Sequence, residues 1–324
     1  MTNSQETKTK ETQREEAPAR QAPAEPGRPT LWVLGIAALA ALGGVVYSLY
    51  QLTGMADGLD ETGVVILAFS LFSPIIVAAY AGAVAGLVMT RVFKGPRRAF
   101  AMLGAVLIGM VSGVVAYASF SVDPDIALAV GLVMFGSAVL GGLFALPKRS
   151  VTVAAGLVAT LLLLAFMFGR GLFEAATSVS LFSDPLDQYG ALGSAIPFAA
   201  GLACGLAAFA YLRAKKSGVK LLGHLVAGAI PGAIWLVSTI VAQIGVEVVL
   251  GIGVGELGQL DAAFLALSFQ WQYNGSMTAL FAGALCAVLA YGLLIPRAPK
   301  IKRVNTIVSF PDKDQPSDKT AKTS

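Results

Sequence analysis

The sequence predicts an all-α integral membrane protein, a polytopic bundle of about eight transmembrane helices. Three observations lead to this fold class. Hydrophobic residues make up 56% of the 324-residue chain and charged residues only 13%, with a mean hydropathy of +0.74. Apolar runs long enough to cross about 30 Å of hydrocarbon recur along the chain. The polar loops between these runs alternate between basic and acidic.

A single transmembrane domain lies between two polar tails. Residues 1–29 contain Lys, Arg, Glu, Gln, Thr, Ala and Pro with almost no large apolar residue. Such a segment cannot bury enough surface to offset the entropy cost of ordering its backbone. Residues 298–324 are polar and charged in the same way. We therefore predict disordered cytoplasmic tails at 1–29 and 298–324 and a transmembrane domain over 30–297.

The topology follows from one basic loop between two apolar runs. Arg91, Lys94, Arg97 and Arg98 lie in this loop without an acid, which is typical of a short cytoplasmic loop. Pro74 lies in the long run before the loop, where it predicts a kink or the end of a short outer piece. We place the spans at 31–53, 63–90, 99–121, 126–146, 151–169, 190–212, 221–245 and 275–296.

The remaining charges agree with eight crossings and two cytoplasmic termini. The other loops predicted to lie inside contain only bases, namely Lys148 and Arg149, then Arg213, Lys215, Lys216 and Lys220, then Arg297, Lys300, Lys302 and Arg303. The loops predicted to lie outside contain Asp57, Asp60, Glu61, Asp123, Asp125, Glu174, Asp184, Asp187, Glu247, Glu256 and Asp261, with Arg170 as their only base. Bases concentrate in cytoplasmic loops, so we predict a multi-pass plasma-membrane protein.

A shift of 119 positions brings five glycines of one half of the domain onto five glycines of the other. It carries Gly82, Gly86, Gly104, Gly109 and Gly113 onto Gly201, Gly205, Gly223, Gly228 and Gly232. One interpretation is a parallel repeat of two four-helix halves, 31–147 and 150–297, as in some transporter folds. The other is chance coincidence in a glycine-rich chain.

Eight of these glycines form Gly-x-x-x-Gly pairs, which place two small residues on one helical face. The pairs are Gly82 with Gly86, Gly109 with Gly113, Gly201 with Gly205, and Gly228 with Gly232. Such faces allow two helix backbones to approach closely in lipid. We assign them to helix packing, and the alternative is a set of sliding surfaces between two rocking halves.

The stretch 246–274 separates the last two spans and is the most unusual local pattern. Glycines alternate at 251, 253 and 255, which disfavours a helix interior. One hypothesis is a re-entrant or mouth-lining loop with Glu247 and Glu256 facing a cavity as part of a substrate or ion path. The alternative, which we favour, is an exposed outer loop that leads into an interfacial helix with aromatic anchors.

His224 is the only histidine and lies about one turn inside the cytoplasmic end of the seventh span. An ionisable group inside a membrane is a candidate for a proton path, although no carboxylate lies in the neighbouring inner loops. The acid pairs of the outer loops have the oxygen ligands of a cation site, but they are equally what the charge asymmetry leaves outside. We predict no metal site, no cofactor and no catalytic residue.

The absence of known motifs excludes some classes of function. The chain has no zinc-hydrolase, phosphate-binding or serine-hydrolase motif, so we do not expect an enzyme, and its short basic loops give no reason to expect nucleic-acid binding. A transporter or permease-like protein for a small solute fits the repeat and the glycine faces best. The alternative is a non-catalytic membrane subunit or scaffold that packs against a membrane or cytoplasmic protein partner. The lipid bilayer is the one partner that the sequence identifies, and it does not identify which protein such a subunit would bind. The abundance of Ala, Gly and Val is typical of a bacterial inner-membrane protein.

Overall fold

In the computed structural model, residues 25–55, 61–93, 95–119, 123–177, 194–254 and 258–294 are described, and every regular element within them is a helix. Eight spans in this part of the chain are long and apolar enough to cross a membrane, which confirms the all-α polytopic prediction. The elements are α2 (Arg28–Met55), α3 (Glu61–Ser70), α4 (Phe72–Val92), α5 (Arg97–Ser119), α6 (Pro124–Gly142), the 3-10 turn η1 (Leu143–Ala145), α7 (Ser150–Thr177), α9 (Ala195–Ala214), α10 (Leu221–Gly253) and α11 (Gln259–Leu294).

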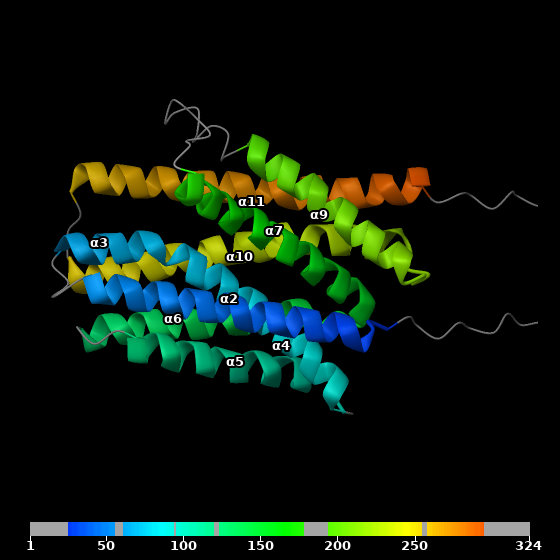
Figure 1. The fold of residues 1–324 in the computed structure, drawn as a ribbon, viewed down its shortest axis with the longest axis horizontal. Coiled ribbons are helices and arrows are strands. Elements are labelled where there is room, and N and C mark those ends of the chain that lie inside the picture. The colour runs from blue at the N-terminus through cyan, green and yellow to red at the C-terminus, as the bar shows by residue number, and fades with distance from the viewer. Residues whose placement is uncertain are drawn as a thin grey trace, which may run out of the picture.

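The helices form an elongated bundle in which successive spans alternate in direction (Figure 1). Helices α4, α5 and α6 pack on one another with α2 against α4, while α9, α10 and α11 pack together with α7 against α9 and α10. The two groups are joined chiefly by α10, which also contacts α3, α4 and α6. The start of α2 and the end of α11 lie at the same end of the bundle (Figure 1).

Charged side chains gather at the two ends of the bundle. At the end where α2 begins, the described side chains include one acid, Glu25, and ten bases, namely Arg28, Arg91, Arg97, Arg98, Lys148, Arg149, Arg213, Lys215, Lys216 and Lys220. At the other end the described charged side chains are all acids, namely Asp123, Asp125, Glu247 and Asp261. We call these the basic end and the acidic end.

Helix α6 shows why the chain turns where it does at the acidic end. Asp123 adopts an extended backbone and caps the helix, since its carboxylate accepts hydrogen bonds from the backbone N–H of Asp125 at 2.8 Å and of Ile126 at 3.4 Å. Pro124 occupies the first helical position, where a missing N–H leaves no bond unmade. This cap fixes the start of the fourth span two residues before its predicted position.

The predicted glycine-rich loop after the seventh span is wrong. Helix α10 continues to Gly253 and α11 begins at Gln259, so the residues we placed in a loop at 246–253 are helical. Val246, Val249 and Leu250 are buried at helical spacing and hold this segment in a helix. A Cβ at Gly253 would lie 2.7 Å from the side chain of Val64, so this glycine permits a close contact with α3.

The predicted interfacial helix is likewise corrected, because residues 259–274 are the first part of the 36-residue helix α11. At 1.5 Å per residue α11 is about 54 Å long, well beyond the thickness of the hydrocarbon core. Its aromatic residues therefore lie on a helix that runs the length of the bundle, rather than on a separate surface helix (Figure 1).

The predicted tail boundary at residue 29 falls inside the structured part of the chain. Helix α2 begins at Arg28, and Glu25 forms an ion pair with Arg91 at the end of α4. The boundary was missed because the partner that orders Glu25 is distant in sequence. Residues 1–24 and 295–324 lie outside the described residues, so the tails themselves stay predictions.

Candidate functional site

The second span has an irregular turn at Leu71, in the half of the span that is nearer the acidic end. Helix α3 ends at Ser70 and α4 begins at Phe72, with Leu71 between them. The Leu71 N–H donates to the carbonyl of Ala68 at 3.3 Å, which tightens the last turn of α3. Helix α3 has 10 residues, so the irregular turn lies about 15 Å from the start of α3 at the acidic end, in the outer half of the Gly63–Val92 span. The short outer piece predicted from Pro74 is therefore present.

Pro74 leaves one backbone carbonyl without its helical partner. A proline has no N–H, so the carbonyl of Ser70 cannot receive the bond that residue 74 would donate in a regular helix. The Ser70 hydroxyl donates to the carbonyl of Leu67 at 2.8 Å, within α3. Exposed backbone at this depth is tolerated only where protein or water lines it.

A cavity of about 670 Å³ lies beside this irregular turn, between α2, the α3–α4 junction and the end of α7. We call it the serine cavity. Three of its lining residues, Ser48, Ser70 and Ser73, carry hydroxyl groups. Gly44 on α2 and Met167 on α7 also line it. Gly44 and Ser48 are exposed, so the cavity opens on the side of α2. The site therefore combines hydroxyl donors and acceptors with an irregular helical turn in an apolar surround.

The serine cavity was not predicted, although a local signal was available. Ser70, Ser73 and Pro74 are spaced so that two hydroxyls and a proline fall within one helical turn of one another. The proline alone was recognised. Ser48 could not have been connected with them, because it comes from a helix that only the folded chain brings alongside.

Of the predicted path residues, Glu247 lies in a different cavity, at the acidic end. Its carboxylate accepts a hydrogen bond from the Gln243 side chain at 3.2 Å, and Gln243 accepts one from the hydroxyl of Tyr273 at 2.8 Å. These three residues line a recess of about 470 Å³ between α10 and α11. Glu247 itself is exposed. Glu256 lies outside the described residues.

His224 lies far from Glu247, 23 residues away on the same helix, or about 35 Å along its axis. Its ring is buried between the rings of Phe209 at 5.6 Å and Tyr291 at 4.7 Å. Its Nδ1 has no hydrogen-bond partner. The structure therefore does not bring Glu247 and His224 together, and the role of His224 in a proton path stays a prediction.

The eight glycines assigned to helix packing all lie against a neighbouring helix or the η1 turn. A Cβ added at Gly113 would lie 2.8 Å from the carbonyl oxygen of Gly131, and one added at Gly201 would lie 2.7 Å from that of Ala279. Similarly close contacts, most of them to backbone, occur at Gly82, Gly86, Gly109, Gly205, Gly228 and Gly232. These positions set the distances between helices that enclose the cavities.

No protein family, curated protein or solved structure matches this chain. Among the residues that the structure describes, no group of three or more His, Cys, Asp or Glu side chains is placed to hold a metal ion. Cys204 and Cys286 are free thiols, and the Cys204 thiol donates to the carbonyl of Ala159 at 3.2 Å. The cavities are therefore the features of the described chain that point to a function.

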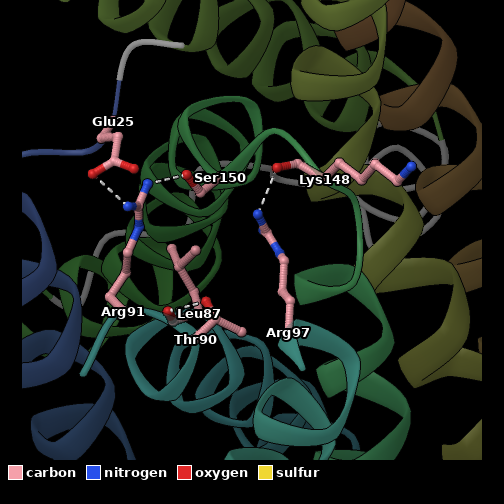
Figure 2. A network of polar contacts seen from close by, with 7 residues as sticks. All are labelled: Glu25, Leu87, Thr90, Arg91, Arg97, Lys148 and Ser150. Carbon is pink, nitrogen blue, oxygen red and sulfur yellow. Dashed lines mark hydrogen bonds and ion pairs between the residues drawn. The ribbon is translucent and has the colours of Figure 1, made fainter. Parts of the chain in front are cut away.

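A polar network at the basic end ties the start of the chain to both halves of the bundle (Figure 2). The guanidinium of Arg91 pairs with Glu25 at 2.6 Å and donates to the hydroxyl of Ser150 at the start of α7. Arg97 donates to the carbonyl of Lys148 at 2.5 Å and to that of Ala145 at 3.3 Å, in the segment between α6 and α7. Two arginines therefore hold the connection between the fourth and fifth spans.

The ion pair between Glu25 and Arg91 gives a pH-dependent contribution to stability. The hydrogen bond from Arg91, and then its charge, lower the pKa of Glu25 below its ordinary value of 4.5. The contribution is thus fully present above about pH 4.5 and is lost as the pH falls through the lowered value. Since the Glu25 side chain is 68% exposed, solvent screens the pair.

We expect Glu25→Gln to lower the free energy of unfolding by about 0.5 kcal/mol or less at pH 7 and by less at pH 3 than at pH 7. Thermal unfolding of the purified wild type and variant at the two pH values measures both differences. An equal difference at both pH values would show that the carboxylate charge is not what stabilises this contact.

Proposed function

We propose that this chain is a multi-pass permease for a small uncharged solute and that the solute binds in the serine cavity. The observation that carries the proposal is the irregular turn of the second span beside Pro74, where Ser70 and Ser73 line a cavity that also has the hydroxyl of Ser48 in its wall. Interrupted helices beside a midplane cavity are how several transporter folds present backbone and side-chain polar groups to a solute. The proposal includes no catalytic step.

The distribution of charge supports an uncharged solute. Among the side chains that the structure describes, all carboxylate, guanidinium and ammonium groups lie at the two ends of the bundle, and none of them lines the serine cavity. Binding an ion at this depth without a counter-charge would be costly. Hydroxyl groups can instead exchange hydrogen bonds with a solute that carries hydroxyl or amide groups.

The pairing of helices supports two similar halves. In the first half α4, α5 and α6 pack on one another, and their counterparts α9, α10 and α11 do the same in the second. Three of the five matched glycine pairs also fall on matched contacts, since Gly82, Gly109 and Gly113 face α6 while Gly201, Gly228 and Gly232 face α11, whereas Gly86 and Gly104 have no such match. Two parallel four-helix halves around a central site would permit alternating access.

We also propose a bacterial plasma-membrane location with both termini in the cytoplasm. The basic end carries ten of the described bases, and both ends of the described chain lie there. Bases are retained on the cytoplasmic side during insertion. The acidic end then faces outward.

The test is solute entry into vesicles that contain the purified protein. Light scattering follows the swelling of proteoliposomes and of protein-free liposomes under inward gradients of glycerol, erythritol and urea. We expect at least one of these solutes to enter faster in the presence of the protein. Equal rates for all three would contradict the proposal, and a stoichiometric partner recovered on gentle extraction would then favour the membrane-subunit alternative.

Ser73→Ala is expected to slow entry of the accepted solute about fivefold, because it removes one hydrogen-bonding group worth about 1 kcal/mol. Ser119→Ala is the matched control. Its hydroxyl bonds only the carbonyl of Val115 on its own helix, at 2.8 Å, and it does not line the serine cavity. If the two variants slow entry equally, the hydroxyl of Ser73 does not contact the solute.

A further inference from the structure

A second cavity, of about 290 Å³, lies on the other side of α7, and Met167 lines both. We call it the aromatic cavity. Phe72, Phe166, Trp235 and Trp271 supply most of its walls, and Ser268 and Gln272 are its polar lining residues. These residues come from α4, α7, α10 and α11, and most lie in the part of each helix nearer the acidic end. The cavity is therefore mainly apolar and belongs to the acidic half of the bundle.

Two lining residues have polar atoms without a partner in the protein. The side chain of Trp235 is 8% exposed, and its indole N–H makes no hydrogen bond. The side-chain amide oxygen of Gln272 is buried and unpartnered as well. Buried polar groups are nearly always hydrogen-bonded, because leaving them unpaired is costly. A donor and an acceptor without a partner in the protein therefore belong to two residues that line one cavity.

The position of Trp235 is fixed by its neighbours. A Cβ at Gly275 would lie 3.2 Å from the indole ring and 3.1 Å from the ring of Pro197, so the indole packs close against α11 where glycine leaves room. With the residue 8% exposed, this packing limits how far the indole can turn its N–H toward another protein group. A ligand in the cavity can supply the acceptor that the protein does not.

We propose that the aromatic cavity binds an uncharged amphiphile, with an apolar body among the aromatic rings and one hydroxyl or primary amide group at Trp235 and Gln272. An indole N–H only donates and an amide oxygen only accepts, so the matching group must do both. A charged headgroup is disfavoured because none of the charged side chains that the structure describes lines the cavity. The inference does not depend on solute transport through the serine cavity.

Tryptophan fluorescence can report binding directly. The chain has three tryptophans, and Trp32, which is 72% exposed on α2, is the one outside the cavity. In a Trp32→Phe background both remaining tryptophans line it. In nanodiscs of saturated phosphatidylcholine, we expect 10-bromo-1-decanol to quench this fluorescence to saturation. Quenching that only rises in proportion to the probe concentration would overturn the proposal.

Gln272→Leu is expected to weaken binding of bromodecanol about tenfold, since it removes the buried acceptor. Binding of 1-bromodecane, which lacks the hydroxyl, should not weaken. Gln270→Leu is the matched control because Gln270 is exposed, two residues away on α11, and lines the outer recess instead. Equal affinity of bromodecanol for both variants would overturn the assignment of its hydroxyl to Gln272.

Ala200→Leu provides a second variant that does not alter polar groups. Ala200 is buried and lines the cavity, so a larger apolar side chain should fill it and remove saturable quenching by both probes. Mass spectrometry of lipids extracted with the protein distinguishes the source of the amphiphile. A neutral lipid enriched in the wild type but not in Gln272→Leu identifies a membrane lipid, and saturable quenching without such enrichment identifies a soluble amphiphile.

Discussion

Gly82→Ala is expected to lower the free energy of unfolding by about 3 kcal/mol, the upper part of the range for an overpacked core. Gly82 lies in the fully buried part of α4, where the carbonyl group of Ala138 on α6 occupies the position that a Cβ would need. On the same interface Gly141 lies equally close to the backbone of Ala79. Because both obstacles are backbone atoms, neither can be relieved by a side-chain rotation, and the two helices must separate.

The matched control is Gly136→Ala on α6, the helix that Gly82 faces, at a position where a Cβ would meet nothing within 4 Å. Alanine stabilises an unobstructed helical position by up to about 1 kcal/mol relative to glycine. We therefore expect Gly136→Ala to be neutral or stabilising. Reversible unfolding of both variants in mixed detergent micelles measures the difference, and a similar loss in each would show that the α4–α6 contact is not what requires glycine at residue 82.

The sequence predicted the helical architecture well because its signals are local. Apolar runs and basic loops gave eight spans, and the irregular turn in the second span was indicated by Pro74. The helix-packing role of the glycines also followed from their spacing. In each case the physical cause lies within one helix or one loop, where a pattern of neighbouring residues reveals it.

The candidate sites could not be predicted because they are made by contacts between distant helices. The hydroxyls of Ser48 and Ser73 meet at one cavity only after α2 packs against α4. Trp235 and Gln272 had no local signal, since neither belongs to a motif. What marks them is a missing hydrogen-bond partner, which only the folded chain reveals. The sequence instead pointed to single ionisable residues such as Glu247 as candidate path residues, and Glu247 lies at the acidic end of the bundle.

The error at residues 246–253 has a specific cause. Glycine was read as a helix breaker from its conformational freedom, yet in a bundle of closely packed helices it also permits contact between backbones. The buried residues Val246, Val249 and Leu250 follow a helical period through the same segment. In such a sequence the period of the buried apolar residues indicates the secondary structure better than the glycines do. The glycines instead indicate where a neighbouring helix packs closely.

Gly44→Phe is expected to abolish protein-dependent solute entry. Gly44 lines the serine cavity, and a Cβ built there meets nothing within 4 Å. A phenylalanine can therefore be accommodated without displacing a helix, and its ring would occupy space beside the hydroxyls of Ser48 and Ser73. We expect proteoliposomes with this variant to swell at the rate of protein-free liposomes while the protein unfolds at the wild-type temperature.

Gly43→Phe separates blockage from a general effect of adding a ring to α2. Gly43 is also free of contacts within 4 Å, but it does not line the cavity, and it points about 100° away around the helix. It should keep wild-type swelling. If Gly44→Phe retained solute entry while folding normally, the serine cavity would not be the route. If both variants lost solute entry, the loss would come from adding a ring anywhere on α2 and not from filling the serine cavity. Blockage by Gly44→Phe alone places the solute beside the irregular turn of the second span.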